Sequence, residues 1–90
     1  DDFTNIYAYP NPVLPNYKGE VVIKGLMADT QVRILDANGN LVKVLTGLGG
    51  EVIWDVTNTA GDRVASGIYT AICNTADGQA YGTTKVLVMN

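Results

Sequence analysis

The chain has 90 residues, of which 47% are hydrophobic and 17% charged, and its net charge is −3. This length fits one domain, and the composition is that of a globular protein and not of a disordered tail. The six Lys and Arg residues are scattered singly, which argues against binding to nucleic acid or to an anionic membrane surface. No apolar run approaches the roughly 18–20 residues of a membrane-spanning helix.

Short segments rich in β-branched residues follow one another along the chain and are separated by turn signals. In chain order, the predicted strands are Ile6–Tyr9, Val21–Lys24, Gln31–Leu35, Asn40–Leu45, Glu51–Asp55, Gly67–Asn74 and Thr83–Met89. Several of them alternate apolar and polar residues, as half-buried strands do, and no window shows the 3.6-residue period of a helix. About seven short strands at this spacing predict an all-β fold, an immunoglobulin-like antiparallel β-sandwich, with a small barrel as the alternative.

Two dipeptides mark tight turns between these strands. Asn38-Gly39 and Asp77-Gly78 are favoured in hairpins because such turns need positive φ angles. Alternation along the strands then predicts which side chains face the core. This inward set is Val21, Ile23, Val32, Ile34, Val42, Val44, Val52, Trp54, Tyr69, Ala71, Val86 and Val88.

Catalytic and metal-binding patterns are missing from the sequence. The chain has no His, so it lacks the Ser-His-Asp and Cys-His pairs of nucleophilic enzymes and has no imidazole metal ligand. Asp36–Asn40 imitates the first half of a calcium loop, but Leu41 and Gly47 stand where that loop needs its glycine and its bidentate acid. A hairpin turn explains the same residues. We expect no enzymatic activity, no metal and no cofactor.

The sequence also supports predictions for its single cysteine and for four of its tyrosines. Cys73 is the single cysteine, and we expect it to be a small buried apolar residue in its strand. The candidates for a sugar-binding aromatic platform are Tyr7, Tyr9, Tyr17 and Tyr81, and at least one of them is expected to pack against the domain instead.

The order and spacing of several short motifs carry a resemblance to a known family. They are Tyr9-Pro10-Asn11-Pro12-Val13, Val32–Asp36 leading to Gly39 and Val42, Trp54-Asp55 leading to Asn58, Gly61 and Val64, Ser66-Gly67-Ile68-Tyr69, and Lys85-Val86-Leu87-Val88. This succession resembles the C-terminal sorting domain of proteins exported by the type IX secretion system of Bacteroidetes. More distantly it is similar to the immunoglobulin-like domain of the flagellar hook-capping protein. Residues 1–8 are then the end of a linker with a possible first strand, and residues 9–90 are the sorting-type domain.

The resemblance implies a function as an address. Such a domain passes through the periplasm and is recognised by an outer-membrane translocon and its shuttle barrel. A sortase-like protease then acts on many members, and the parent protein is secreted or held at the cell surface. The recognition motif carried over to this chain is Tyr9, Pro10, Asn11, Pro12, Gly39, Gly61, Gly67, Tyr69, Lys85, Val86 and Val88. We expect the isolated domain to be a monomer or a weak dimer.

Two positions depart from the family pattern, and each motif residue also has a structural explanation. Val56 stands where glycine is common, and the chain ends Val88-Met89-Asn90 where many members end on a basic residue. The prolines restrain the chain and blunt an edge strand, the glycines serve turns, and Tyr69 packs in the core with its hydroxyl bonded to backbone.

The mechanism that fits the family is recognition of an edge strand. The terminal strand Thr83–Met89 would offer unpaired backbone groups to a partner. The alternatives to a sorting function are an immunoglobulin-like spacer or scaffold and a carbohydrate-binding module.

Overall fold

The computed structural model describes residues 5–26, 29–47, 49–75, 77–78 and 81–90. Its strands are β1 (Tyr7–Tyr9), β2 (Val21–Lys24), β3 (Thr30–Leu35), β4 (Leu41–Thr46), β5 (Glu51–Trp54), β6 (Gly67–Thr75) and β7 (Tyr81–Val88). All seven predicted strands are present, with ends that differ by at most two residues from the expected ones. No helix in the described part of the chain could cross a membrane.

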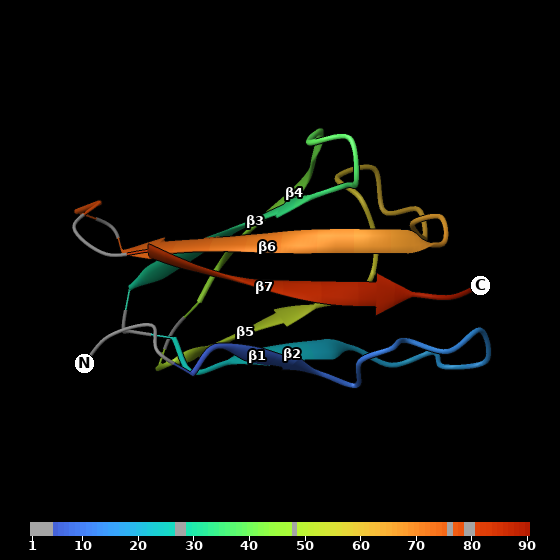
Figure 1. Cartoon of the computed structure of the whole chain (residues 1–90), viewed down its shortest axis with the longest axis horizontal. Helices are drawn as coiled ribbons and strands as arrows, with labels where there is room; N and C mark the ends of the chain where they lie inside the picture. The colour runs from blue at the N-terminus through green and yellow to red at the C-terminus, as the bar shows by residue number, and fades with distance from the viewer. Residues whose placement is uncertain (1–4, 27–28, 48, 76, 79–80) are drawn as a thin grey trace.

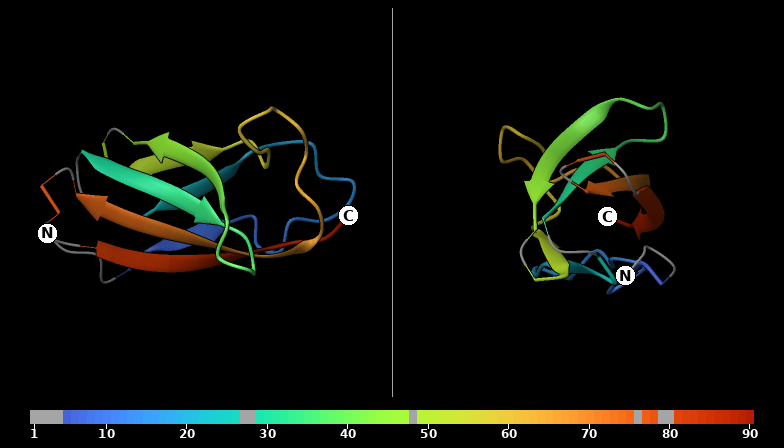
Figure 2. Two further views of the ribbon diagram at one scale, coloured as in Figure 1. Left: turned by 90° about the horizontal axis from the view of Figure 1, so that it is seen from above. Right: turned by 90° about the vertical axis from the view of Figure 1, so that its left-hand side faces the viewer.

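The strands form two antiparallel sheets that pack face to face (Figures 1 and 2). The smaller sheet has the order β1-β2-β5 and the larger one the order β4-β3-β6-β7. The chain therefore changes sheet between β2 and β3, between β4 and β5 and between β5 and β6. This arrangement confirms the predicted immunoglobulin-like sandwich.

Two aromatic residues join the sheets across the core. Trp54 of β5 is fully buried and Tyr69 of β6 is 6% exposed, and their ring centroids lie 5.7 Å apart at a tilted angle. The Tyr69 hydroxyl donates a 2.6 Å hydrogen bond to the Ala65 carbonyl four residues earlier. That bond matches the tyrosine corner of immunoglobulin-like sandwiches. It confirms the prediction that Tyr69 is a core residue with its hydroxyl tied to backbone.

The prediction for strand β4 was wrong at Val44. That side chain is 46% exposed, and Val42 is only partly buried, whereas all other members of the predicted inward set are buried. An irregularity in the β3–β4 pairing at Ile34/Leu35 sets the register, so Lys43 pairs with Ile34 and Leu45 with Val32. Lys43 and Leu45 consequently share the inward face. At the open edge of a sheet, an inward-pointing lysine also discourages pairing with another chain.

The Lys43 ammonium is held by the loop that follows Trp54. Its Nζ lies 3.3 Å from Asp55 Oδ1 and 2.9 Å from Thr57 Oγ1. The Thr57 hydroxyl also donates to Asp55, and the Trp54 indole donates to the Thr57 carbonyl at 2.9 Å. The Thr57 hydroxyl and then Lys43 hold the pKa of the Asp55 carboxyl below its ordinary value.

The region that imitates a calcium loop is a hairpin turn. Asp36 Oδ1 accepts hydrogen bonds of 2.9 Å from the backbone N–H groups of Asn38 and Asn40. These bonds, that of Asn40 above all, lower the pKa of Asp36. Gly39 has φ of 85°, which a residue with a Cβ atom adopts only with strain. Within the described residues, no group of three or more His, Cys, Asp or Glu side chains gathers at a potential metal site.

The tyrosine corner yields a first prediction. Tyr69→Phe removes the hydroxyl and leaves the Ala65 carbonyl without this donor, so the free energy of unfolding should fall by about 1–2 kcal/mol. Urea denaturation followed by Trp54 fluorescence measures the change. Tyr7→Phe is the matched control, because Tyr7 is 51% exposed. Equal stability of the two variants would contradict the structural role of the hydroxyl.

The Asp55 network predicts a loss of stability in acid. A carboxyl whose pKa is lower in the folded chain than in the unfolded chain stabilises the fold when it is ionised. This contribution is present above the ordinary pKa of 3.8 and is lost as the pH falls through the lower folded value. Denaturation curves between about pH 5 and pH 2 should show the loss. Asp55→Asn keeps an acceptor oxygen but cannot ionise, so its stability should fall less steeply than that of the unmodified chain. An equally steep fall would contradict the assignment.

Candidate docking site

Strand β7 is the edge of the larger sheet, and β6 covers one of its two sides. Val86 and Val88 point into the core and are at most 1% exposed, whereas Lys85 and Leu87 lie on the outer face. Alternate residues of an antiparallel edge strand direct their backbone N–H and C=O groups away from the neighbouring strand. In β7 these outward groups belong to residues 81, 83, 85 and 87. A partner that pairs with the larger sheet at this end of the strand order would meet these groups.

Asn11 occupies part of this edge with its side chain alone. Its Nδ2 donates to the Lys85 carbonyl at 2.9 Å, and its Oδ1 accepts from the Leu87 N–H at 2.9 Å. A carboxamide carries a donor and an acceptor, as a peptide group does. Asn11 therefore replaces one residue of a neighbouring strand, across a sequence separation of more than 70 residues.

Val13 continues the same contact with its backbone. Its N–H donates to the Leu87 carbonyl at 2.7 Å, and its carbonyl accepts from the Met89 N–H at 2.8 Å. The result is a parallel bridge between Val13 and Val88, and the Val13 side chain is fully buried. We call Asn11–Val13 the β7 clip.

The clip limits the predicted exposure of unpaired backbone groups along Thr83–Met89 to the first part of that segment. From the Lys85 carbonyl to the Met89 N–H, every outward backbone group has a partner in the clip. The outward groups of Thr83 and the Lys85 N–H have no hydrogen-bond partner among the described residues. The open part of the edge thus lies at the start of β7.

The residue after the strand end is also held in place. The Asn90 N–H donates to Ser66 Oγ at 2.8 Å, and its Nδ2 donates to the Val64 carbonyl at 2.8 Å. The sequence analysis named Ser66 as part of a family motif and Asn90 as part of the chain end, but it predicted no contact between them. No local pattern marks this contact, because the two segments are more than 20 residues apart.

The structure brings most of the predicted recognition motif to β7. Gly67 and Tyr69 pair with Val88 and Val86 across the β6–β7 ladder, and Asn11 binds Lys85 and Leu87. The motif residues gathered here are Asn11, Gly67, Tyr69, Lys85, Val86 and Val88, and Tyr9, Pro10 and Pro12 adjoin Asn11 along the chain. The peptide bonds before both prolines are cis.

Two motif glycines lie elsewhere. Gly39 is in the β3–β4 turn and Gly61 in the loop after β5, with φ angles of 85° and 89°. A Cβ atom at either position would meet nothing within 4 Å, so the positive φ is what favours glycine there. These two residues shape turns and do not join the β7 cluster.

The outer face beside β7 is apolar and basic. Ile68 and Leu87 form a cross-strand pair on this face and are 50% and 39% exposed. Arg33 and Lys85 add positive charge, and strands β3, β4, β6 and β7 contain no Asp or Glu although the whole chain has a net charge of −3. We call Ile68, Lys85 and Leu87 the docking face. Sequence reasoning missed Ile68 and Leu87 as surface residues, although the alternation that placed Val86 and Val88 inside would have placed Leu87 outside.

The tyrosine candidates for a sugar platform separate into three cases. Tyr7 and Tyr9 are exposed on the smaller sheet, with ring centroids 6.0 Å apart. Tyr17 is partly buried against the core, and its hydroxyl donates to the Glu20 carbonyl at 2.8 Å. One tyrosine therefore packs against the domain, as expected. The side chain of Tyr81 lies outside the part of the chain that the structure describes.

Cys73 confirms its prediction as a buried residue. The thiol is fully buried in β6, and burial raises its pKa to about 11. A thiol in this state is protonated near neutral pH and is a poor nucleophile.

Comparison with known proteins gives two structural neighbours. The chain is similar to part of PorZ, an essential bacterial surface component of the type IX secretion system of Porphyromonas gingivalis, with 32% identity and a TM-score of 0.84 over 96% of this chain. It is also similar to part of dimeric latent PorU from the same organism, with 24% identity and a TM-score of 0.64 over 92% of this chain. At that identity the second likeness shows the fold alone.

This chain corresponds to 12% of PorZ and 9% of PorU, so each match is to one domain-sized part of a larger protein. No family model and no curated protein matches the sequence. The neighbours confirm the resemblance to a domain of the type IX secretion system.

The clip yields a prediction about local stability. Asn11→Ala removes two hydrogen bonds that hold β7, so we expect the free energy of unfolding to fall by about 1–2 kcal/mol. Hydrogen exchange measured by NMR should show faster exchange of the Leu87 N–H, which Asn11 accepts, than of the Val86 N–H, which faces β6. Asn11→Asp is the sharper variant, because it keeps an acceptor for Leu87 but loses the donor to Lys85. Unchanged exchange at Leu87 in Asn11→Ala would show that the clip does not hold the strand.

Proposed function

We propose that this chain is a non-catalytic sorting and docking module that directs a larger protein through type IX secretion to the cell surface. The observation that carries the proposal is the similarity to PorZ over 96% of the chain at 32% identity. PorZ is a surface component of that system, and the matched part is one domain of it. A module that recurs in such proteins fits an address shared by different cargoes.

The arrangement around β7 supports docking by a rigid surface. The clip and the Asn90 contacts hold the last strand in one place, so a partner meets a surface that is already ordered. Pre-ordering lowers the entropic cost of binding. The open start of β7 offers backbone groups, and the docking face adds apolar area and positive charge. Partners in the secretion machinery, namely an outer-membrane translocon, a shuttle barrel and a sortase-like protease, belong to this proposal.

Two side chains with potentially reactive groups are held within the domain. Cys73 is buried and protonated, and Asp55 binds Thr57 and Lys43. These states support a role in recognition without catalysis by this domain.

A spacer between domains is the second candidate. The parallel bridge between Val13 and Val88 means that the first and last strands run in the same direction. The chain therefore starts β1 near one end of the sandwich and finishes β7 near the other, as Figure 1 shows. That geometry suits a string of domains.

Export of a fused reporter separates the two candidates. The chain is joined to the C-terminus of a periplasm-directed reporter enzyme in Porphyromonas gingivalis, and surface exposure is measured by protease treatment of whole cells. We expect the reporter at the surface when type IX secretion is active and in the periplasm when it is inactivated. The corresponding domain of PorZ is the reference fusion. Retention of this chain in both strains, or display in both, would contradict the sorting function.

Surface variants then test the docking face. Leu87→Ser combined with Ile68→Ser should reduce surface display at least about tenfold, because exposed apolar anchors dominate binding energy. Ile53→Ser is the matched control, since Ile53 is 48% exposed on the opposite sheet. Thermal unfolding of the purified variants checks that each is folded. Equal loss in the control and the double variant would show that the docking face has no specific role.

A further inference from the structure

The outer face of the larger sheet carries two cations that no carboxylate of the described chain neutralises. Arg33 of β3 and Lys85 of β7 are exposed, and neither side chain forms an ion pair or a hydrogen bond with another described residue. Strands β3, β4, β6 and β7 contain no Asp or Glu, so all nine acidic residues lie outside this sheet. The face is therefore positive in a chain whose net charge is −3.

The other two cations on strands each have an acidic partner. Lys24 Nζ of β2 lies 3.7 Å from Glu51 Oε1 on the neighbouring strand β5, and Lys43 Nζ of β4 lies 3.3 Å from Asp55 Oδ1. Opposite charges on paired residues stabilise a sheet. The domain thus compensates its strand cations everywhere except on the outer face of the larger sheet.

Uncharged residues occupy the positions opposite the two free cations. Arg33 pairs with Val44 on β4 and with Ile72 on β6, and Lys85 pairs with Thr70 on β6. An acidic residue at any of these three positions would neutralise its neighbour, because directly paired side chains are within reach of each other. The register therefore leaves both positive charges available to a molecule outside the domain.

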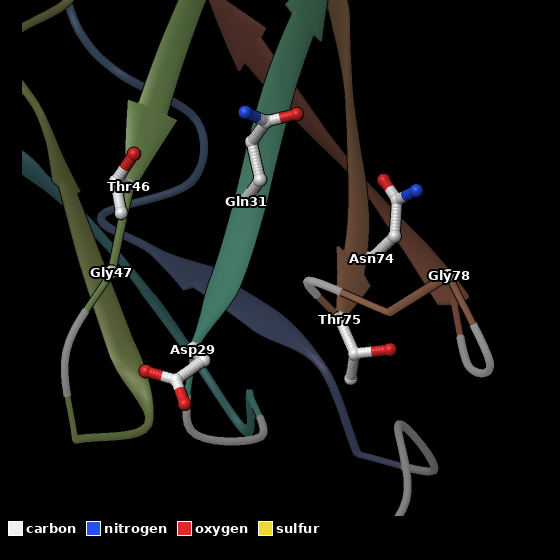
Figure 3. A pocket seen from close by; sticks show the side chains of 7 residues that line it. All are labelled: Asp29, Gln31, Thr46, Gly47, Asn74, Thr75 and Gly78. Atoms are coloured by element: carbon white, nitrogen blue, oxygen red, sulfur yellow. The ribbon is translucent and has the colours of Figure 1, made fainter.

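The next row of the sheet is uncharged as well. Gln31 pairs with Thr46 and with Asn74, and Figure 3 shows these polar side chains on three neighbouring strands. Asp29 lies beyond this row at the start of β3 and forms no ion pair in the described structure. Past the other end of β3, the Asp36 carboxylate accepts backbone N–H groups of its own turn. The acids at the two ends of β3 thus do not neutralise the face.

The surroundings of the two cations favour a protein partner over a membrane or a nucleic acid. Strand β6 separates Arg33 from Lys85, so their Cα atoms lie roughly 12 Å apart across the sheet. Exposed Val44, Ile68 and Leu87 lie on the same face. Anionic membranes attract clusters of about four to eight basic residues, and nucleic acids need a basic track. Apolar side chains with isolated cations, arginine above all, are typical of protein interfaces.

We propose that the docking partner presents an acidic protein surface to this face, with one carboxylate bound by Arg33 and a second by Lys85. The inference rests on the proposed docking function and names the chemistry of the partner. The Arg33 guanidinium can donate two parallel hydrogen bonds to a carboxylate, and the Lys85 ammonium adds a compact charge. Ile68 and Leu87 supply the apolar contact beside them. Complementary charge also orients the partner as it approaches, because it acts before contact is made.

Charge reversal in the reporter fusion tests the proposal. Arg33→Glu combined with Lys85→Glu should reduce surface display at least about tenfold, because like charges then face each other across the interface. Lys18→Glu combined with Lys24→Glu is the matched control, since it changes the net charge by the same amount outside the larger sheet. Arg33→Lys combined with Lys85→Arg keeps both charges and should retain most of the display. Thermal unfolding of the purified variants checks that each is folded.

The outcomes separate this inference from the function on which it rests. If the unmodified fusion does not reach the surface, the sorting function fails and the acidic partner fails with it. If the unmodified fusion is displayed and the reversal at Arg33 and Lys85 is displayed equally, only the acidic partner is overturned. An equal loss of display in the matched control would also overturn it, because the effect would then come from net charge.

A zero-length carbodiimide cross-linker identifies the chemistry of the contact directly, because it joins a lysine amine to a carboxylate that touches it. The purified fusion is incubated with outer-membrane fractions of Porphyromonas gingivalis, treated with the cross-linker and digested for mass spectrometry. We expect Lys85 joined to Asp or Glu of a membrane protein, with less product at exposed Lys18. Arg33→Glu leaves the Lys85 amine in place but should abolish its product. Equal products at Lys18 and Lys85, or a Lys85 product that persists in Arg33→Glu, would overturn the proposal.

A lipid surface is the competing source of negative charge and has its own measurement. The chain is sedimented with vesicles of phosphatidylethanolamine and phosphatidylglycerol. We expect no binding above that to vesicles of phosphatidylethanolamine and phosphatidylcholine, which carry no net charge. Binding to the anionic vesicles that is lost in the Arg33→Glu and Lys85→Glu variant would overturn the protein partner and assign the face to the membrane.

Discussion

The clip between Asn11–Val13 and strand β7 is the contact on which the architecture depends. β1 belongs to the smaller sheet and β7 to the larger one, and the chain that leaves β1 reaches across the rim to β7 before it returns to the smaller sheet as β2. It does so by adding the Asn11 side chain and the Val13 backbone to the edge of β7. This rim is consequently closed by hydrogen bonds as well as by side-chain packing. The buried Val13 side chain links that closure to the core.

The closed rim also decides which surfaces are left for a partner. An unprotected edge strand is a template for pairing with other chains. This molecule protects β4 with the inward Lys43 and protects the second half of β7 with the clip. The start of β7 and the outer face around Ile68 and Leu87 have no such protection in the described part of the chain. A recognition surface is expected where ordinary protection stops, because edge pairing and apolar contact are then available to a partner.

Much of the fold could be predicted from the sequence, because its signals are local. β-branched runs and Gly-containing turns predicted all seven strands, and every side chain that simple alternation placed inward on β2, β3, β5, β6 and β7 is buried. The error at Val44 has a physical cause, since a pairing irregularity shifts which residues of β4 face inward and nothing in the β4 sequence announces it. Lys43 even argues locally against an inward position, and only its partners Asp55 and Thr57 make that position favourable.

The candidate site could be predicted only in part, because its contacts are long-range. The motif around Asn11 was identified through its resemblance to a family, but the role of its carboxamide depends on a strand more than 70 residues away. The contact of Asn90 with Ser66 and Val64 was invisible for the same reason. A pattern read along the chain reports which residues face a common side, whereas pairing across the chain has to be seen in three dimensions.

Two residues break local rules, and the difference between them is informative. Val56 is a β-branched residue with φ of 64°, where glycine would be free of strain. Its side chain is fully buried and its carbonyl accepts from the Val64 N–H at 3.1 Å, so contacts inside the domain offset the strained backbone. Asn74 has no such compensation, because its buried Oδ1 has no partner within the described structure. The strained backbone at Val56 is thus offset by contacts within the fold, whereas the buried oxygen of Asn74 is a cost that the described contacts do not offset.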